Sequence, residues 1–370
     1  MKHKSLIFLG ISLIILAVML YFVGIDSIIS ALKVANPWLI LIAVAIQFLI
    51  FYMYALRWNI INGVAGIKVS LKKIFPMTLV GLAFNNITPA GRGGGEPVRA
   101  YILSRDSDYP MEETFATVIA DRALDTFPFV ILAILTIIGA TFYFKIATWL
   151  LVLMIIAVIA IIAVLAILIY MVLNEKFSIK VSNFIIKIVR KFYKKNPETL
   201  EKKIFDVVAG FQDTIKIMLA KNNIAKYALP LSFVIWIFEI LRVYVVFLAF
   251  GANISPIIIG EVFIMASLVG MIPLLPGGVG AVDGIMILFY AMAGISTSIS
   301  AAATVIERLI SFWMVTIIGM CITPFYGKSV FDKISFNPKA DQTAEDIVDE
   351  FEDIGADGEV FDEDYDKKQS

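Results

Sequence analysis

Hydrophobic positions along the chain gather in long continuous runs, and polar residues are confined to the intervals between them. A run of about 20 apolar residues is long enough to cross a bilayer as a helix. Six runs reach or approach this length: Ser5–Val23, Trp38–Leu56, Thr114–Tyr143, Ala147–Leu173, Tyr227–Phe250 and Thr297–Phe325. The first run could be a signal peptide, but it lacks a small-residue cleavage site and is as long as a true span. The pattern therefore predicts an all-α polytopic membrane protein with about six full spans.

Two further apolar segments are shorter, and each runs into a stretch rich in glycine. Ile74–Thr88 leads into "PAGRGGGE", and Pro256–Leu275 leads into "PGGVGAVDG". Each could be one span plus a loop, or a re-entrant hairpin that returns to its own side. Non-helical backbone at membrane depth is tolerated only where protein or a water-filled cavity covers it. As hairpins, the segments would line a cavity with their tips, which are Pro89, Gly91, Gly93, Gly94, Pro276, Gly277, Gly278 and Gly280.

The distribution of charge favours the hairpins. The interval 174–226 has a large excess of lysine and arginine and apolar residues at helical spacing, which predicts one or two amphipathic helices. If six runs cross and both hairpins return, this interval and both termini face the cytoplasm, where Lys and Arg accumulate. If the first hairpin crossed, the basic interval would face outward. We expect its charge to be attracted to anionic lipid and not to nucleic acid.

An internal repeat connects the two broken segments. "ALRWNIINGVAGIKVS" resembles "ILRVYVVFLAFGANIS", "PAGRGGGE" resembles "PGGVGAVD", and "TVIADR" resembles "ATVIER", with an offset of 185 to 187 residues throughout. In the topology above the two copies have opposite orientation, as in the inverted repeats of secondary transporters. We expect one membrane domain, residues 1–334, with repeats at about 38–143 and 227–326. An acidic, disordered cytoplasmic tail, residues 335–370, would follow.

Charged residues also fall inside the predicted spans. They are Asp121, Arg122, Asp125, Glu239, Arg242, Glu307 and Arg308. Each costs about 2.5–3.5 kcal/mol to place at the bilayer centre unless it faces water, protein or a partner. Glu239 and Arg242 are one turn apart and can pair within their helix. The neighbours Asp121 and Arg122, like Glu307 and Arg308, project about 100° apart, so each needs a partner elsewhere. These charges are either structural pairs or a polar pathway, and we favour the pathway.

Composition removes several classes of chemistry. Apolar residues make up 60% of the 370 residues, far above a soluble domain. A single cysteine, Cys321, and a single histidine, His3, exclude a disulfide, a Cys/His metal site and Ser–His or Cys–His catalysis. The glycine stretch lacks the Lys-Ser/Thr ending of a nucleotide P-loop. We therefore expect no cofactor, no metal and no catalytic residue.

Helices that begin after the hairpin tips would direct their amino ends toward the membrane centre. Helix amino ends carry partial positive charge and suit an anionic group such as a lipid phosphate. Glu96 and Asp283 occupy matching places and could bind a cationic part of a head group or anchor arginines. Close packing of the hairpin arms is the alternative role for the glycines. The candidate head-group pathway comprises Asn86, Arg92, Glu96, Arg99, Asp121, Arg122, Asp125, Glu239, Arg242, Asp283, Glu307 and Arg308.

Four motifs resemble those of a known family. They are "NNITPAGRGGGEPVRAYIL", "ATVIADRALD", "PLLPGGVGAVDG" and "ATVIERLISFW". They are similar to the lysylphosphatidylglycerol synthase transmembrane-region family of flippase-like proteins, over nearly all of Ser5–Tyr326. The family includes the membrane part of the multiple peptide resistance factor, which flips aminoacylated phosphatidylglycerol. The resemblance implies that both hairpins, Asp121/Arg122 and Glu307/Arg308 line a lipid pathway.

Taken together, these patterns predict a flippase-like lipid translocase of the cell membrane, with membrane lipids as its partners and passive or ion-coupled transport. A membrane enzyme or accessory subunit in lipid or glycolipid synthesis is the alternative, with Asp121 or Glu307 as a base. A separate lipid-modifying enzyme is a further candidate partner. A small-ion or solute carrier is a third hypothesis. The sequence shows no aminoacyl-transfer or glycosyltransferase domain, which favours transport over catalysis.

Overall fold

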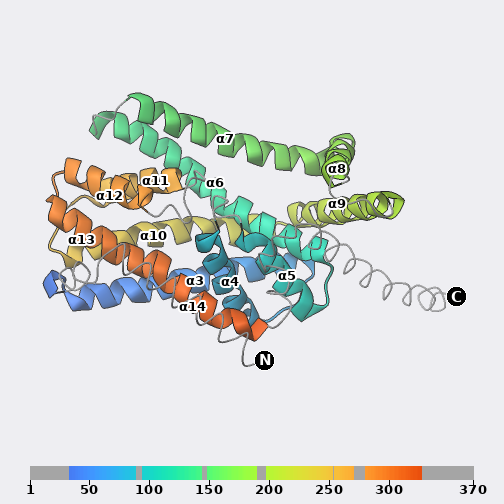
Figure 1. Cartoon of the computed structure of the whole chain (residues 1–370), viewed down its shortest axis with the longest axis horizontal. Helices are drawn as coiled ribbons and strands as arrows, with labels where there is room; N and C mark the ends of the chain where they lie inside the picture. Colours follow the sequence, from blue (N-terminus) through green and yellow to red (C-terminus); the bar gives the residue numbers. More distant parts are fainter. Residues whose placement is uncertain are drawn as a thin grey trace.

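The structure is a computed structural model that describes residues 33–88, 94–143, 148–189, 197–252, 254–270 and 280–326. All regular secondary structure in these ranges is helical (Figure 1). The α-helices are α3 (Pro37–Ala65), α4 (Leu71–Ile87), α5 (Gly95–Ser107), α6 (Met111–Tyr143), α7 (Thr148–Leu173), α8 (Glu175–Val189), α9 (Pro197–Ala220), α10 (Leu229–Ala249), α11 (Pro256–Gly270), α12 (Ala281–Met292), α13 (Thr297–Arg308) and α14 (Met314–Ile322). The remaining elements are the π-helical turns η1 (Ile224–Ala228) and η3 (Leu309–Trp313) and the 3₁₀ turn η4 (Thr323–Tyr326).

Five helical runs in the described ranges are long and apolar enough to cross a membrane. They are Pro37–Ala65, Met111–Phe142, Thr148–Leu173, Ile224–Ala249 and Thr297–Tyr326. These runs confirm the all-α polytopic class, and they coincide with five of the six predicted spans. The other predicted features lie outside the described residues, namely the span Ser5–Val23, the tail 335–370, Arg92 and the tip residues Pro89, Gly91, Gly93, Pro276, Gly277 and Gly278.

Helix α3 is longer than the apolar pattern predicted, since it continues past Leu56 to Ala65. The pattern ends early because Arg57 and Asn62 are polar, yet both side chains are buried in the bundle. Gly66, with φ of 99°, ends the helix in the left-handed conformation, and its N–H bonds back to the last turn. An arginine directly after an apolar run is typical of the membrane surface, whereas Arg57 lies within α3 and is buried.

Two long helices, α3 and α10, pack side by side along the molecule (Figure 1). The broken segments form two pairs of packed short helices, α4 with α5 and α11 with α12, toward opposite ends of the long helices. α4 also packs against α14. Both α5 and α11 pack against α6, and α12 packs against α13. α7 lies at the edge of the bundle, and α8 and α9 lie at the end nearer α5. The basic interval 174–226 therefore contains two helices, as its apolar spacing predicted.

The α4–α5 pair depends on a close approach between two glycines. A Cβ added to Gly95, at the start of α5, would overlap the backbone oxygen of Gly81 in α4. Asn85 fixes the same junction, because its side-chain oxygen accepts a hydrogen bond of 2.6 Å from the backbone N–H of Gly95. The side chain of Arg99 crosses Gly81 closely, and a Cβ added to Gly81 would overlap the Arg99 side chain. Glycine at these two positions lets α5 present its charged residues against α4.

Replacing Gly95 with alanine is therefore expected to destabilise the protein by about 1–3 kcal/mol, the usual cost of overpacking. The added methyl group would meet backbone, which cannot move aside as a flexible side chain would. The measurement is the midpoint of thermal unfolding in detergent. Gly63→Ala is the matched control, because no atom lies within 4 Å of a Cβ at that helical glycine. Alanine there should be neutral or stabilise by about 0.5–1 kcal/mol. Equal midpoints for the two variants would contradict the close approach.

Apolar packing forms a separate core around each pair of short helices. The larger core joins α11 and α12 to α6 and α10, and includes the rings of Phe247 and Tyr290, which are tilted to each other with their centres 4.2 Å apart. The second core joins α4 and α5 to the carboxyl half of α3 and to α14, with Trp58 fully buried in it. The cavity described next is lined by helices of both cores.

Candidate functional site

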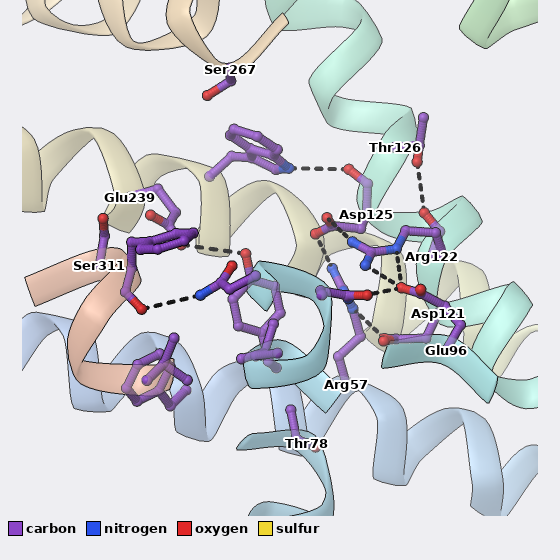
Figure 2. Close-up of a pocket in the computed structure, with 18 of the residues that line it drawn as sticks. Arg57, Thr78, Glu96, Asp121, Arg122, Asp125, Thr126, Glu239, Ser267 and Ser311 are labelled. Atoms are coloured by element: carbon purple, nitrogen blue, oxygen red, sulfur yellow. Dashed lines mark hydrogen bonds and ion pairs between the residues drawn. The ribbon is translucent and has the colours of Figure 1, made fainter. Parts of the chain in front are cut away.

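A cavity of about 670 Å³ lies within the bundle, a volume typical of small-molecule sites. Its wall is formed by α3–α7, α10–α13, η3 and α14. Charged residues from several helices line it, and Figure 2 shows some of them. They are Arg57, Glu96, Arg99, Asp121, Arg122, Asp125, Glu239, Arg242, Glu307 and Arg308. Arginines and carboxylates are equal in number, so this lining has no net formal charge.

Asp121 on α6 joins two arginines. Its Oδ1 accepts a bond of 2.7 Å from Nε of Arg57, and its Oδ2 accepts one of 3.0 Å from Arg99. Arg57 also donates to Asp125 at 2.8 Å. The guanidinium of Arg99 lies 4.0 Å from the ring centre of Trp58, which adds a cation–π contact. These side chains are almost completely buried, so each charge depends on its partners.

Arg122 is the most accessible arginine of the ion pairs in the cavity. Its side chain is 40% exposed, against 1–9% for the paired Arg57, Arg99, Arg242 and Arg308. It pairs with Glu96, which also accepts a hydrogen bond from the side-chain amide of Asn85. In Figure 2 the side chains of Arg57, Arg122 and Asp125 point toward one another. Arg122 is thus held in place from one side while its other side remains open.

The second group of charges lies on α10, α12 and α13. Arg242 donates to Glu307 at 2.8 Å and also pairs with Glu239 on its own helix. Arg308 pairs with Asp283 at 2.9 Å and lies 4.4 Å from the ring centre of Phe312. The π-helical turn η3 begins directly after Arg308 and places Ser311 and Phe312 in the cavity wall. Such turns are frequent at functional sites, because they change the register of the following residues.

Hydrogen bonds cross between α3 and α10 at the cavity. Arg57 donates to the hydroxyl of Ser232 at 3.1 Å, and Arg242 donates to the side-chain oxygen of Gln47. The hydroxyl of Tyr54 donates to Glu239 at 3.3 Å. These contacts tie the two charged groups into one network that spans both long helices.

Contacts in the two halves correspond at a constant separation along the chain. Two ion pairs among α3, α5 and α6 each match an ion pair among α10, α12 and α13. The matching residues are separated by 185 to 187 positions along the chain. The matching pairs are Arg57–Asp121 with Arg242–Glu307, and Arg122–Glu96 with Arg308–Asp283. Gln47 and Ser232, which accept from the two equivalent arginines, are likewise 185 residues apart.

The two halves differ at a few positions of the lining. At the separations given above, Met286 takes the place of Arg99, and Ser311 takes the place of Asp125. The first half thus has one more arginine and one more carboxylate in the cavity wall than the second. In Figure 2 Ser311 and Glu239 lie on the opposite side of the cavity from Arg122. The more accessible charge is therefore concentrated on the side of α5 and α6.

Most of the sequence-predicted site residues come together here. Predicted pairing within one helix is confirmed for Glu239 and Arg242, and predicted partners on other helices are found for Asp121, Arg122, Glu307 and Arg308. Asn86 also lines the cavity but takes no part in the ion pairs. It donates to the carbonyl of Phe312 at 3.1 Å and to Thr316 at 2.9 Å. Gly94 and Gly280 directly precede α5 and α12.

Sequence reasoning missed Arg57, Tyr54, Gln47 and Asn85 as site residues. Arg57 could have been found, because it matches Arg242 in the repeat and Arg242 was assigned to the pathway. Asn85 lies one residue before the Asn86 that was chosen. Tyr54 and Gln47 are single polar groups within an apolar run, and their roles depend on Glu239 and Arg242 of a distant helix.

Comparisons with known proteins agree with the sequence resemblance. Residues 5–319 match the family described as "Lysylphosphatidylglycerol synthase TM region". A UPF0104 membrane protein of Methanothermobacter thermautotrophicus is 49% identical over 90% of this chain and 99% of its own length. Another from Methanocaldococcus jannaschii is 34% identical over 85% of this chain and 93% of that protein. A third, from Pyrococcus horikoshii, is 29% identical over 86% and 96%. The chain therefore belongs to the family of the lysylphosphatidylglycerol synthase transmembrane region and is an integral multi-pass membrane protein.

Proposed function

We propose that the protein moves a polar or charged lipid between the two leaflets of the cell membrane. The head group would cross through the charged cavity while the acyl chains remain in an apolar environment. The observation that carries the proposal is the composition of the cavity wall, which combines ion pairs with apolar residues of α7, a helix without charged residues. A wall of this kind matches a molecule with a charged end and an apolar end. Membership of a family named for a lipid synthase supports a membrane lipid as that molecule.

Helix α7 supplies the apolar part of the wall. Residues of α7 that line the cavity are Ala160, Ile161, Val164, Leu165 and Leu168. The helix carries no charged residue, and only 11% of its most apolar window is buried in the bundle. α7 therefore contacts the cavity on one face and presents most of its surface outward, toward lipid. Acyl chains could leave the cavity along α7 without contacting the ion pairs.

We infer that the two halves are an inverted duplication. Its support is the agreement of ion pairs, hydrogen bonds and helix packing at separations of 185 to 187 residues. Tyr54 and Glu239 are themselves 185 residues apart and bond to each other, as equivalent residues do on a two-fold axis. The two pairs of short helices lie toward opposite ends of the long helices (Figure 1). This arrangement suits re-entrant hairpins from opposite faces and alternating access to a central site.

Orientation follows from the basic residues. The helices α8 and α9, with exposed Lys176, Lys180 and Lys187, lie at the same end as α5 (Figure 1). Because lysine and arginine accumulate in cytoplasmic loops, we assign that end to the cytoplasm. The α4–α5 hairpin would then enter from the cytoplasm and the α11–α12 hairpin from outside. Both termini would be cytoplasmic, as the sequence predicted.

A membrane enzyme or accessory subunit in lipid or glycolipid synthesis is the alternative function. Its candidate bases are Asp121 and Glu307, since both are buried acids in the cavity wall. Asp121 accepts bonds from two arginines and Glu307 from one, at 3.0 Å or less. Both acids thus already have guanidinium partners in this conformation. The ion pairs therefore favour translocation over proton abstraction.

The test is lipid exchange in vesicles that contain the purified protein. Labelled anionic, aminoacylated and polyprenyl-linked lipids are placed in one leaflet, and their appearance in the other leaflet is followed by bleaching of the exposed label. We expect at least one class to exchange faster than in protein-free vesicles and in vesicles with an unrelated membrane protein. Exchange at the protein-free rate for all three classes would contradict the proposal. Product formation from a lipid substrate without exchange would support the enzyme alternative.

A further inference from the structure

Glu261 on α11 is a buried acid that does not belong to the cavity. Four acidic residues are buried among the described residues, namely Glu96, Asp121, Glu261 and Glu307. Three of them pair with arginine. Glu261 is 8% exposed, has no hydrogen bond or ion pair within the described part of the chain, and its Oε2 is completely buried. The three paired acids thus have a structural explanation for their charge, and Glu261 does not.

The carboxyl of Glu261 lies directly against the backbone of α6. A Cβ added to Gly139 would overlap its Oε1, so glycine makes the room that the carboxyl occupies. Ala140 of α6 and Val262 of α11, the next residues in sequence, both belong to the larger hydrophobic core, so the contact lies beside apolar packing. An ionised carboxylate is very unfavourable in such a place without a partner, and the group takes up a proton instead. The packing of α11 on α6 therefore favours a neutral carboxyl.

Charged groups on α6, α7 and α11 do not offer Glu261 a partner. It is the only charged residue of α11, and α7 has none. Toward the amino end of α6 the nearest cation is Arg122, 17 residues before Gly139, or about 26 Å along a helix. Tyr170, the titratable group of α7, lies near the opposite end of that helix and bonds to Asn174.

Charged groups on α10 and α12 already have other partners. On α10, Arg242 and Glu239 pair with each other, and Arg242 also binds Glu307. On α12, Asp283 pairs with Arg308, and the hydroxyl of Tyr290 donates to the carbonyl of Ile259 at 3.1 Å. No group on the four helices packed against α11 therefore compensates a charge on Glu261 in this conformation, within the ranges that the structure describes.

We propose that Glu261 is a proton-binding site that couples the position of the α11–α12 pair to protonation. In the conformation described here the carboxyl holds a proton and α11 lies against Gly139. Release of the proton to water leaves a carboxylate that must leave the apolar contact, and α11 moves away from α6. Ala266 and Ser267, which follow on the same helix, line the cavity, so this movement changes its wall. The site would supply the ion coupling of transport, and this last step rests on the proposed function.

Infrared spectroscopy of the purified protein tests the proton directly, without any lipid transport. We expect a protonated carboxyl band that disappears in Glu261→Gln and that decreases in the native protein as pH rises. Asp106→Asn is the matched control, since Asp106 is a half-exposed acid paired with Lys73 and its replacement should leave the band unchanged. Glutamine is neutral and similar in shape, so the variant should fold. An unchanged band in Glu261→Gln would overturn the proposal.

Vesicles with a pH difference across the membrane test the coupling. With one proton per lipid, the steady-state distribution of the lipid between leaflets should shift by up to about tenfold per pH unit. The shift should vanish in Glu261→Gln while exchange without a gradient persists. A gradient-dependent shift that survives in Glu261→Gln would overturn the coupling. If neither the native protein nor Glu261→Gln exchanges lipid, the proposed function is refuted instead. The infrared result would still decide whether Glu261 binds a proton.

Discussion

Replacing Asp121 with asparagine is expected to destabilise the protein by about 3–5 kcal/mol, the usual cost of breaking a buried ion pair from one side. The change leaves Arg57 and Arg99 without their shared counter-ion, and both guanidinium groups are more than nine-tenths buried. Asparagine can still accept a hydrogen bond, so the predicted loss arises from the missing charge. The measurement is the midpoint of thermal unfolding in detergent, followed by tryptophan fluorescence.

Asp106→Asn is the control for this prediction. Asp106 pairs with Lys73 at 2.8 Å, but the lysine side chain is 56% exposed and the aspartate 32%. Exposed pairs of this kind contribute about 0–1 kcal/mol, so this variant should unfold close to the native midpoint. If Asp121→Asn also unfolds near the native midpoint, the buried network does not hold α3, α5 and α6 together.

The sequence was sufficient to predict the helices, the pairing of Glu239 with Arg242, and the need of four other charges for partners on other helices. Long apolar runs have few alternative structures in a membrane, because each backbone polar group must bond within its own helix. Two adjacent charges on a helix must find partners elsewhere, which is how the ion pairs of Asp121, Arg122, Glu307 and Arg308 could be expected. The repeat added the correspondence between the two halves, and the observed pairs agree with it residue for residue.

Other features could not be predicted, because they depend on contacts between distant helices. The end of α3 was placed nine residues too early, since Arg57 looks like the end of a span until Asp121 is seen beside it. Tyr54 becomes polar lining only because Glu239 of α10 lies against it. Glu261 resembles any polar residue at the start of a short apolar helix, and its isolation is visible only when the neighbouring helices are known.

Arg122 is the most exposed arginine of the ion pairs in the cavity wall, and the largest effect on the proposed lipid exchange is expected there. We expect Arg122→Ala to slow lipid exchange by about 10- to 100-fold, since a hydrogen bond to a charged group contributes about 1.5–3 kcal/mol. The arginine side chain is 40% exposed in the cavity, whereas its equivalent Arg308 is 9% exposed and stacked on Phe312. Arg122→Ala should therefore affect exchange more strongly than Arg308→Ala in this conformation. The measurement is the initial rate of exchange in vesicles with equal amounts of protein.

Loss of Arg122 also leaves Glu96 without its cation, and this second effect must be separated from the first. Glu96 would keep only the amide of Asn85 as a hydrogen-bond donor. The double variant Arg122→Ala with Glu96→Gln removes both charges, so it should restore thermal stability but not exchange. Arg105→Ala, at the last turn of α5 and outside the cavity wall, should exchange at the native rate. If the double variant exchanges lipid as fast as the native protein, Arg122 serves only to neutralise Glu96, and the head group does not bind it.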